Sequence, residues 1–465
     1  MLSNSFESTA AGLRPSYLSP QSFVKKSTIE GLCYTAFRTA VPTQLLNRLY
    51  GRLDAATRSP LQQTMLLAQQ KGILLYAVGG AVRDLLIGSD RIGLDLDLVV
   101  EGDAIALAGV LALHLKVPVA SHPRFGTATI KGAGFRLDLA QARSEVYERR
   151  GALPIVRPAS LPDDLARRDF TINAMAVALT GARAGELIDF HGGAADVKAG
   201  LIRVLHDRSF QDDPTRMLRA VRYAGRLGFK IEPKTRQFLK RDLSALEDLS
   251  GARLRHEFER LAHEPTAAAA VAQAQDLGVL QGIDEHLCVS VRQFNALADL
   301  LDATPAARRE AVFFAILLSC KSDKQTEALI SRFGLTGRQA AAVRALAALK
   351  QKEAALGVRG LKVSEVVSLL FGIPVEAMEV LALLTAKPAV RERLRRYLNE
   401  WRFVRPRLNG SDIEALGVPH GAEVGAAIDA LRVARLDGVV SRREDEAMLV
   451  RKRYGRGRSF EGRHG

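Results

Sequence analysis

An alternation of leucine and aspartate at residues 93–100, GLDLDLVV, constrains the fold of this chain more than any other feature. Successive side chains of a β-strand point to opposite faces, so Asp95 and Asp97 share one face and the leucines share the other. At an effective dielectric constant near 20, two carboxylates about 5 Å apart repel each other by roughly 3 kcal/mol. Water at an edge strand can offset this repulsion, and so can a divalent cation, which prefers carboxylate oxygens. The pattern predicts either an edge strand or a metal site.

A glycine pair stands shortly before these aspartates, in YAVGGAVRDLLIG. The pattern predicts a strand that ends at Val78, a turn at Gly79 and Gly80, and a helix that opens with Arg83 and Asp84. Backbone N–H groups at such a helix start can hold a phosphate, and glycine permits its close approach. A tight connection without a ligand is the alternative. If a phosphate does bind here, it and a metal at the aspartates could belong to one nucleotide.

A third carboxylate, Asp138, lies in the alternating segment FRLDLA. If its strand neighbours the one that carries Asp95 and Asp97, Asp138 can complete a site for two metal ions. Such a site activates an attacking hydroxyl and stabilises a leaving phosphate. The alternative is an aspartate on the face of a strand that forms a surface ion pair.

The segment SLPDDLARRDFTINAMAVAL contains two adjacent arginines. Ser160, with an aspartate three residues on, predicts a helix start. Arg167, Arg168 and Asp169 end this helix, and Asn173 follows. Arginine offers a planar fork of donors to phosphate oxygens, so these side chains could bind a triphosphate and a ribose hydroxyl. Ordinary charges at a helix C-terminus are the alternative.

The segment FQDDPTRMLRAVRYAGRLGF predicts an amphipathic helix that starts at Pro214 with Asp213 as its cap. At 100° per residue, one arc of about 120° contains four arginines. These are Arg216, Arg219, Arg222 and Arg226. The opposite side holds Met217, Leu218, Val221 and Gly225. The pattern predicts one basic face and one buried face. Asp213 and Arg216, one turn apart, could together hydrogen-bond the edge of a base.

The composition indicates a large globular protein with a polyanionic partner. The chain has 465 residues and is 47% hydrophobic, which predicts two to four domains. Its net charge of +15, from 66 basic and 51 acidic residues, favours nucleic acid as that partner, with a solvated basic surface as the alternative. Its apolar runs are too short or interrupted to cross a bilayer, so we expect a cytoplasmic protein and no membrane partner. Three scattered cysteines support neither a disulfide framework nor a zinc site.

Several ordered motifs resemble one family. GGAVRDLLIG, LDLDLVV, RFGTATI, LARRDFTINAMA, DFHGGAADVKAGLIRVL, DDPTRMLRAVRYAGRLGF and LSGARLRHEFERL follow one another in this order. Their order and spacing resemble the bacterial class II tRNA nucleotidyltransferases, the branch of the polymerase-β nucleotidyltransferase superfamily that contains CCA-adding enzymes and poly(A) polymerases. The resemblance is strong over about residues 73–265 and fainter to about residue 450.

The resemblance implies an α+β fold, in which a head with a small mixed β-sheet is followed by a helical neck, body and tail. The expected divisions are an N-terminal extension 1–60, a catalytic head 61–205, a neck 206–265, a body 266–350 and a tail 351–465 with a basic C-terminus. Residues 1–60 show no clear periodicity, so we expect them to be loosely structured. No strands are expected after about residue 205. The neck would recognise the nucleotide base, and the tail would bind tRNA.

The resemblance also implies roles for individual residues. Asp95 and Asp97 would hold the catalytic Mg²⁺. Asp138, inferred above from its strand rather than from the resemblance, is the expected third catalytic carboxylate. Nucleotide contacts would come from Gly79, Gly80, Arg83 and Asp84 on the phosphate side, Arg167, Arg168, Asp169 and Asn173 for ribose and triphosphate, Asp213 and Arg216 as an amino-acid template, and Arg219 and Arg222 near phosphates. One position departs from the family, which usually has Glu where this chain has Asp212. The shorter side chain would change how the template helix is braced.

The implied function is the addition of CCA, or part of it, to tRNA 3′ ends from CTP and ATP without a nucleic-acid template. The segment LDLAQARSEVYERRGALPIVRPASL resembles the flexible loop that lets family members switch from C to A, which argues against a CC-only enzyme. An A-adding enzyme and a poly(A) polymerase are the alternatives, followed by a non-catalytic RNA-binding protein. The expected partners are the acceptor stem and 3′ end of tRNA, and no obligate protein partner is evident.

Overall fold

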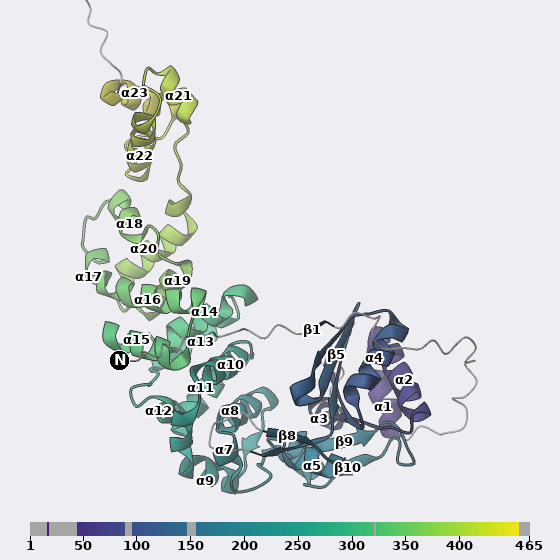
Figure 1. The fold of residues 1–465 in the computed structure, drawn as a ribbon. Coiled ribbons are helices and arrows are strands. Elements are labelled where there is room, and N and C mark those ends of the chain that lie inside the picture. The colour runs from purple at the N-terminus through teal and green to yellow at the C-terminus, as the bar shows by residue number, and fades with distance from the viewer. Residues whose placement is uncertain (1–15, 18–43, 89–94, 147–154, 320–321, 455–465) are drawn as a thin grey trace, which may run out of the picture. The chain divides into compact units, whose positions relative to one another are not determined.

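The chain folds into two compact units. The computed structural model describes residues 16–17, 44–88, 95–146, 155–319 and 322–454 (Figure 1). The first unit is Met1–Leu249 with Leu277–Gly282, and the second is Ser250–Asp276 with Ile283–Gly465. All described strands lie in the first unit, and the described part of the second unit contains helices only. The predicted α+β class is therefore confirmed, whereas the division into five named parts stays a prediction.

A mixed sheet of eight strands forms the centre of the first unit, in the order β1-β4-β5-β6-β3-β2-β9-β10. The strands are β1 (Ser16–Tyr17), β2 (Leu74–Val78), β3 (Asp95–Glu101), β4 (Val119–His122), β5 (Thr127–Gly132), β6 (Phe135–Gln141), β9 (Met175–Ala178) and β10 (Leu187–Asp189). β3 and β6 run parallel, and every other neighbouring pair in this sheet is antiparallel. A parallel pair needs a crossover connection. Here α4 (Ala104–Leu115), β4 and β5 supply it.

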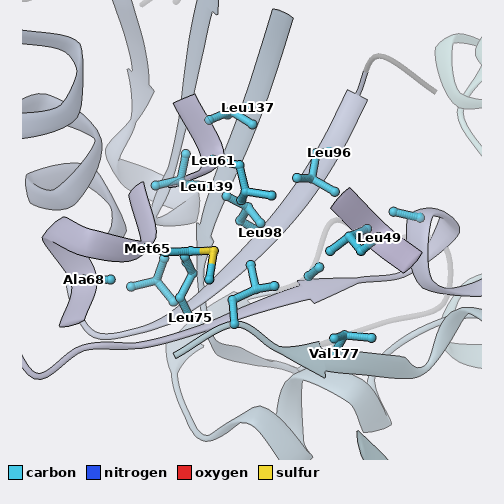
Figure 2. Close-up of a cluster of buried hydrophobic side chains, with 14 of the residues drawn as sticks. Leu49, Leu61, Met65, Ala68, Leu75, Leu96, Leu98, Leu137, Leu139 and Val177 are labelled. Carbon is cyan, nitrogen blue, oxygen red and sulfur yellow. The ribbon is translucent and has the colours of Figure 1, made fainter. Parts of the chain in front are cut away.

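The leucines of β3 explain one half of the leucine–aspartate alternation. Leu96 and Leu98 are buried with Leu137 and Leu139 of β6 in one core cluster (Figure 2). Side chains from four helices complete this core: α1 (Gln44–Arg52), α2 (Ala55–Gln70), α3 (Gly80–Ile87) and α4. Burial of each such leucine contributes about 1.5–3 kcal/mol. The even-numbered positions of β3 are therefore fixed on the face covered by these helices.

The odd-numbered positions of β3 lie on the opposite face. Val99 belongs to a second buried cluster with Leu161 and Leu165 of α5 (Leu161–Ala166). Asp97, two residues from Val99, shares the face of Val99 because strand positions alternate. The sheet thus places Asp97 on the side where α5 packs.

The N-terminal expectation is partly wrong, because β1 lies at Ser16–Tyr17 and the first described helix begins at Gln44 rather than near residue 61. Leu46, Leu49 and Leu53 are buried in the main core. Their spacing is that of the buried face of an amphipathic helix. The spacing was missed because residues 1–60 were judged together by their Ser-, Thr- and Ala-rich composition. The remainder of the predicted extension, residues 1–15 and 18–43, lies outside the described residues.

The expectation that strands end near residue 205 is also wrong. β11 (Leu201–Ile202) pairs in parallel with β12 (Lys230–Ile231). The Lys230 N–H donates to the Gly200 carbonyl at 2.8 Å, and a two-residue pairing of this kind leaves no periodic signal in the sequence. A further two-stranded sheet joins β7 (Arg143–Val146) to β8 (Ile155–Pro158).

Helices fill the rest of the molecule. The first unit also contains α6 (Gly193–Ala199), α7 (Ser209–Asp212), α8 (Thr215–Leu227) and α9 (Pro233–Arg241), and α12 (Val279–Ile283) crosses the division between the units. The second unit contains α10 (Gly251–Ala262), α11 (Ala267–Asp276), α13 (Val291–Leu301), α14 (Ala306–Leu317), α15 (Asp323–Phe333), α16 (Gly337–Gln351), α17 (Glu353–Leu356), α18 (Val363–Leu370), α19 (Val375–Leu384), α20 (Pro388–Asn399), α21 (Gly410–Ala415), α22 (Ala422–Leu436) and α23 (Arg443–Tyr454). No single helix in the described residues is long and apolar enough to cross a membrane. α18 and α19 together meet that length and composition, with a bend of 116° between them.

Candidate active site

A pocket of about 330 Å³ opens on the α5 side of the sheet. Its lining comes from β2, β3, β5, β6 and the end of α5. Four residues that the sequence singled out line it together: Asp97, Asp138, Arg167 and Arg168. Two carboxylates and two guanidinium groups thus share one cavity. Such a cavity suits a ligand that combines bound cations with phosphates.

The two carboxylates come from neighbouring strands in direct register. Asp97 of β3 pairs with Asp138 of β6, which confirms the expected strand neighbours. Asp138 accepts hydrogen bonds from the Thr129 hydroxyl and from Arg136, whose Nε lies 2.9 Å away. Asp97 is exposed. The backbone of Asp95 opens β3, but its side chain lies outside what the structure describes.

The two carboxylates that line the pocket fit a divalent cation. Asp97 and Asp138 offer hard oxygen donors, and Mg²⁺ in proteins is commonly held by one or two carboxylates together with water and substrate phosphates. Among the described side chains, no group of three or more His, Cys, Asp or Glu residues is gathered to hold a metal. Two carboxylates suit an ion that also takes water and substrate oxygens as ligands.

Gly79 allows the turn after β2 to approach this pocket closely. Its backbone has φ 69° and ψ −129°, a conformation that L side chains rarely adopt. A Cβ atom at this position would lie 3.0 Å from Nη1 of Arg168 and 3.9 Å from Oδ2 of Asp97. The glycine, the carboxylate and the guanidinium therefore meet at one corner of the pocket. The predicted strand end at Val78 is confirmed, but α3 begins at Gly80, earlier than the predicted opening at Arg83.

Asp164 of α5 connects the two pocket arginines. Its Oδ1 accepts from Nη2 of Arg167 at 2.7 Å, and its Oδ2 accepts from Nη2 of Arg168 at 3.0 Å. Asp164 is fully buried, and burial alone would raise the pKa of its carboxyl group, but Arg168 and Arg167 lower this pKa below its ordinary value. α5 starts as predicted, since the Ser160 hydroxyl donates to Asp163 at 2.6 Å.

A hairpin strand also contacts this cluster. Nη1 of Arg167 donates to Glu145 of β7 at 2.8 Å, and Arg143 of the same strand lies 3.3 Å from Glu145. Burial, followed by the nearby charge of Arg167, lowers the pKa of Arg143. The β7–β8 hairpin belongs to the segment predicted to be a flexible loop, whose residues 147–154 lie outside the described residues.

A second, more buried cluster lies around Asp169. Its carboxylate accepts from Asn173 Nδ2 at 3.0 Å and from Arg219 Nε at 2.9 Å. Burial alone would raise the pKa of Asp169, but the charge of Arg219 and the hydrogen bond from Asn173 outweigh burial and lower this pKa to about 2. Asn173 in turn accepts from Arg83 at 2.7 Å, and Arg83 also pairs with Asp84. Four of the predicted nucleotide-binding residues therefore form one network with Arg219 of α8.

The basic face of α8 differs from the prediction, because most of it is buried. Arg216 is 4% exposed and Arg222 is 5% exposed, whereas Arg226 is exposed. Arg216 donates to the Ser209 hydroxyl at 2.6 Å and to the backbone carbonyl of Arg167 at 2.7 Å. A buried guanidinium needs such partners, and helical periodicity alone does not reveal them.

The start of α8 and its cap differ slightly from the prediction. α8 begins at Thr215, one residue later than expected. Pro214 therefore occupies the cap position that was predicted for Asp213, and the Asp213 carboxylate accepts from the N–H and the hydroxyl of Thr215 at 3.0 and 2.6 Å. Asp213, Arg219 and Arg222 are not among the described residues that line the pocket.

Sequence reasoning missed several residues that organise the site. Asp164 and Glu145 orient Arg167, as described above. Glu101, at the end of β3, accepts from the first N–H of α5, that of Leu161, at 2.6 Å. Tyr223 of α8 presents its ring to Arg83, Arg219 and Arg222, with guanidinium carbons 4.7–5.6 Å from the ring centre. For Asp164 the sequence did contain a signal, because an acidic residue three positions before Arg167 can form an ion pair with it on a helix.

Comparison with known proteins identifies the family. Residues 75–203 match the poly A polymerase head domain, and residues 228–288 match a probable RNA and SrmB-binding site of polymerase A. An A-adding tRNA nucleotidyltransferase of Geobacter sulfurreducens is 32% identical over 431 residues, which cover 87% of this chain and 48% of that protein. The chain thus spans about half the length of this curated relative.

Two other proteins are similar over nearly their whole length. A CC-adding tRNA nucleotidyltransferase of Deinococcus radiodurans is 33% identical over 385 residues, covering 82% of this chain and 90% of that protein. The solved structure of a Thermotoga maritima CCA-adding enzyme in complex with tRNA-CCA has a TM-score of 0.71 and 28% identity, covering 87% of this chain and 97% of that one. The chain therefore belongs to the class II tRNA nucleotidyltransferase family, as the motifs implied.

Proposed function

We propose that this protein extends tRNA 3′ ends by transferring nucleotides of the CCA sequence from CTP and ATP. The observation that carries the proposal is the pocket in which Asp97 and Asp138 lie in register, with Arg167 and Arg168 in the same lining. Family membership supports it, because the relatives described above are named for A addition, CC addition or CCA addition to tRNA. A cytoplasmic location remains a prediction.

In the proposed reaction, the terminal 3′-hydroxyl of tRNA attacks the α-phosphate of the nucleotide, and pyrophosphate leaves. The pocket residues act mainly by positioning and by charge complementarity. Arg167 and Arg168 would bind the triphosphate through N–H donors. Gly79 itself has no side chain that would keep a phosphate from its backbone, and Nη1 of Arg168 lies at the same corner. Asp169 and Asn173 would hold the nucleotide's ribose through the network that also contains Arg83 and Arg219.

The proposed cofactor is a divalent cation, most specifically Mg²⁺. Asp97 and Asp138 would hold it, together with Asp95 as the sequence implies. When bound, the cation would supply activation of the attacking hydroxyl and charge neutralisation at the phosphates. The hydrogen bonds from Thr129 and Arg136 would keep Asp138 oriented toward this role.

Base selection is proposed to involve Asp213 and Arg216. Arg216 is held by Ser209 and by the Arg167 carbonyl, so a change at Arg167 can be transmitted to it. To hydrogen-bond the edge of a base, Arg216 would exchange one of these protein partners for the base. The Asp212 side chain lies 3.7 Å from His206, so this shorter acid still makes a contact at the end of α7.

An A-adding tRNA enzyme is the second candidate. It is favoured by the A-adding relative, whose similarity covers 87% of this chain. The CC-adding relative has nearly the same identity, so identity alone does not separate the activities. A poly(A) polymerase shares the matched head domain and remains an alternative outcome.

One incorporation experiment distinguishes these functions. The full chain is incubated with Mg²⁺, each labelled nucleotide, and tRNAs that lack CCA or end in CC. Incorporation of two C residues followed by one A supports CCA addition. Addition of A to the CC-ended tRNA alone supports the A-adding enzyme, and a long A tail supports the polymerase. Binding of tRNA without any incorporation would contradict all three and favour a non-catalytic RNA-binding protein.

A further inference from the structure

The two pocket arginines share a single buried partner, Asp164. Its side chain is 0% exposed. One carboxylate oxygen accepts from both Nε and Nη2 of Arg167, at 3.0 and 2.7 Å, and the other accepts from Nη2 of Arg168 at 3.0 Å. Each oxygen therefore serves a different arginine, and one carboxylate fixes the separation of two guanidinium groups.

These contacts restrict long side chains that would otherwise sample many rotamers. The two bonds from Arg167 to one oxygen fix the plane of its guanidinium group, and its third nitrogen is bound by Glu145 at 2.8 Å. Arg168 directs Nη1 to the corner at Gly79, 3.0 Å from where a Cβ would lie. Two adjacent cations repel each other, and a buried carboxylate between them offsets this repulsion. The pocket is thereby preorganised for an anion before the anion arrives.

We propose that Asp164 is a positioning residue that holds Arg167 and Arg168 in the geometry needed to bind the triphosphate of the incoming nucleotide. The inference rests on the proposed function, in which these arginines bind that triphosphate. Asp164 itself is buried behind the arginines and acts through them. A carboxylate that contacted the phosphates directly would repel them, so its value lies in the orientation that it imposes.

The same helix provides a matched control. Asp163 is exposed and accepts hydrogen bonds from the Ser160 hydroxyl at 2.6 Å and from the Ser160 N–H at 3.2 Å. It differs from Asp164 by one position and by its partner, which is a serine rather than an arginine pair. Asp163→Asn and Asp164→Asn remove the same charge from α5. A general electrostatic effect would therefore appear in both variants.

The first experiment measures binding to the full-length protein by calorimetry, with ATP and with inorganic tripolyphosphate as probes. Asp164→Asn is expected to weaken the binding of both probes by about 10- to 100-fold, because the loss of a hydrogen bond to a charged group changes affinity by about this factor. Asp163→Asn is expected to stay within about threefold of wild type, as surface substitutions usually do. In incorporation assays, Asp164→Asn should raise the KM for ATP while kcat and the KM for tRNA stay near wild type.

A double-mutant cycle shows whether Asp164 acts through the arginines. With Arg167→Ala and Arg168→Ala both in place, adding Asp164→Asn is expected to cause little further loss of tripolyphosphate affinity. An additive loss would mean that Asp164 acts on the ligand by another route, and it would overturn the inference. Asp164→Glu, which keeps the charge but displaces it by one methylene, is expected to weaken tripolyphosphate binding in a folded protein.

The outcomes separate this inference from the proposed function. If Asp164→Asn and Asp164→Glu bind tripolyphosphate as Asp163→Asn does, the inference is wrong even when wild type extends tRNA. If circular dichroism and thermal unfolding show that neither Asp164 variant is folded, Asp164 is a structural residue and the inference is also wrong. If tripolyphosphate binding depends on Asp164 but wild type incorporates no nucleotide, the inference stands and the proposed function fails.

Discussion

The arginines that follow α5 and the arginines of α8 are chemically alike but have different surroundings. Arg167 and Arg168 line the pocket, with side chains 17% and 16% exposed. Arg216 and Arg222 are only 4% and 5% exposed and do not line this pocket. The first pair is therefore available to an anion in the pocket. The second pair lies in the protein interior, and the role proposed for Arg216 in base selection requires a change of its protein partners.

This difference teaches that a basic helix face is not by itself a ligand site. A buried guanidinium left without partners is strongly destabilising, so the protein supplies acceptors for it. The buried arginines and the pocket are nevertheless connected, because Arg216 donates to the carbonyl of Arg167. A displacement on α8 can therefore reach the pocket through one backbone group.

The largest expected effect tests whether the pocket is the site of reaction at all. Asp97→Asn should reduce nucleotide incorporation by about 10²- to 10³-fold, because it removes a charge proposed to hold the catalytic cation. Its stability should stay near wild type, since Asp97 is exposed. Incorporation of labelled ATP into CC-ended tRNA measures the loss, and a filter assay measures tRNA binding, which should persist.

The control for this variant is Asp103→Asn. Asp103 is exposed and caps α4, and asparagine caps helices about as well as aspartate. It removes the same charge at a position outside the pocket lining, so incorporation should be unchanged. Full activity in Asp97→Asn would show that the pocket carboxylates are not needed for the reaction.

The comparison between the arginine pairs is tested directly by Arg168→Ala and Arg222→Ala. Arg168→Ala should raise the KM for ATP by about 10- to 100-fold, because its role is at the pocket, and should also lower the free energy of unfolding, because the buried Asp164 keeps Arg167 but loses one charged partner. Arg222→Ala should lower the free energy of unfolding by about 2–4 kcal/mol, because Arg222 is 5% exposed and packs on the Tyr223 ring. Steady-state kinetics and urea unfolding measure the two effects. Equal effects of both variants on KM would contradict the distinction.

Two glycines at the ends of α3 separate backbone strain from contact with the pocket. Gly79→Ala should destabilise the protein by about 1–3 kcal/mol and also weaken ATP binding, because its Cβ would meet Arg168. Gly88 also has a positive φ, of 95°, but a Cβ there would lie in open space. Gly88→Ala should therefore lower stability while leaving ATP binding intact. Calorimetric titration with ATP and thermal unfolding distinguish the pair, and parallel effects on ATP binding would exclude a pocket role for Gly79.

The Asp169 network predicts an acid-sensitive contribution to stability. The pKa of Asp169 is about 2 in the folded protein, compared with an ordinary value of 3.8. Because the folded value is depressed, the stabilisation is present above about pH 4 and is lost as the pH falls through about 2, and it amounts to about 2 kcal/mol. Urea unfolding of wild type and Asp169→Asn between pH 2 and 5 measures it. The difference in unfolding free energy between the two proteins should shrink as the pH falls, and a constant difference would contradict the assignment.

The sequence predicted the features that depend on local pattern. The alternation around Asp97 gave the correct strand faces, the glycine pair gave the turn at Gly79, and Ser160 gave the start of α5. Each rests on backbone geometry or on the period of a strand or helix. The placement of Asp138 opposite Asp97 followed once the strands were assumed to be neighbours.

The features that the sequence did not predict depend on partners distant along the chain. Arg216 is buried because it meets the carbonyl of Arg167, 49 residues away. Glu145 contacts Arg167 across 22 residues, and no periodicity relates the two. Leu46 and Leu49 carried a helical spacing, but it lay within a longer window of weak pattern. Long-range pairing therefore sets the limit of the prediction at this site.

The smallest expected effect is at Arg226, the one exposed member of the four-arginine arc on α8. Arg226→Ala should change the free energy of unfolding by less than about 0.5 kcal/mol, since a solvated side chain loses few contacts and alanine favours the helix. ATP binding should also be unchanged, because the contact with a pocket residue belongs to the buried Arg216. Urea unfolding and calorimetry measure both quantities, with Arg222→Ala as the buried counterpart. If Arg226→Ala instead weakens tRNA binding at unchanged stability, the exposed end of α8 contacts the RNA. α8 would then contribute buried arginines to the protein interior and an exposed arginine to the RNA-binding surface.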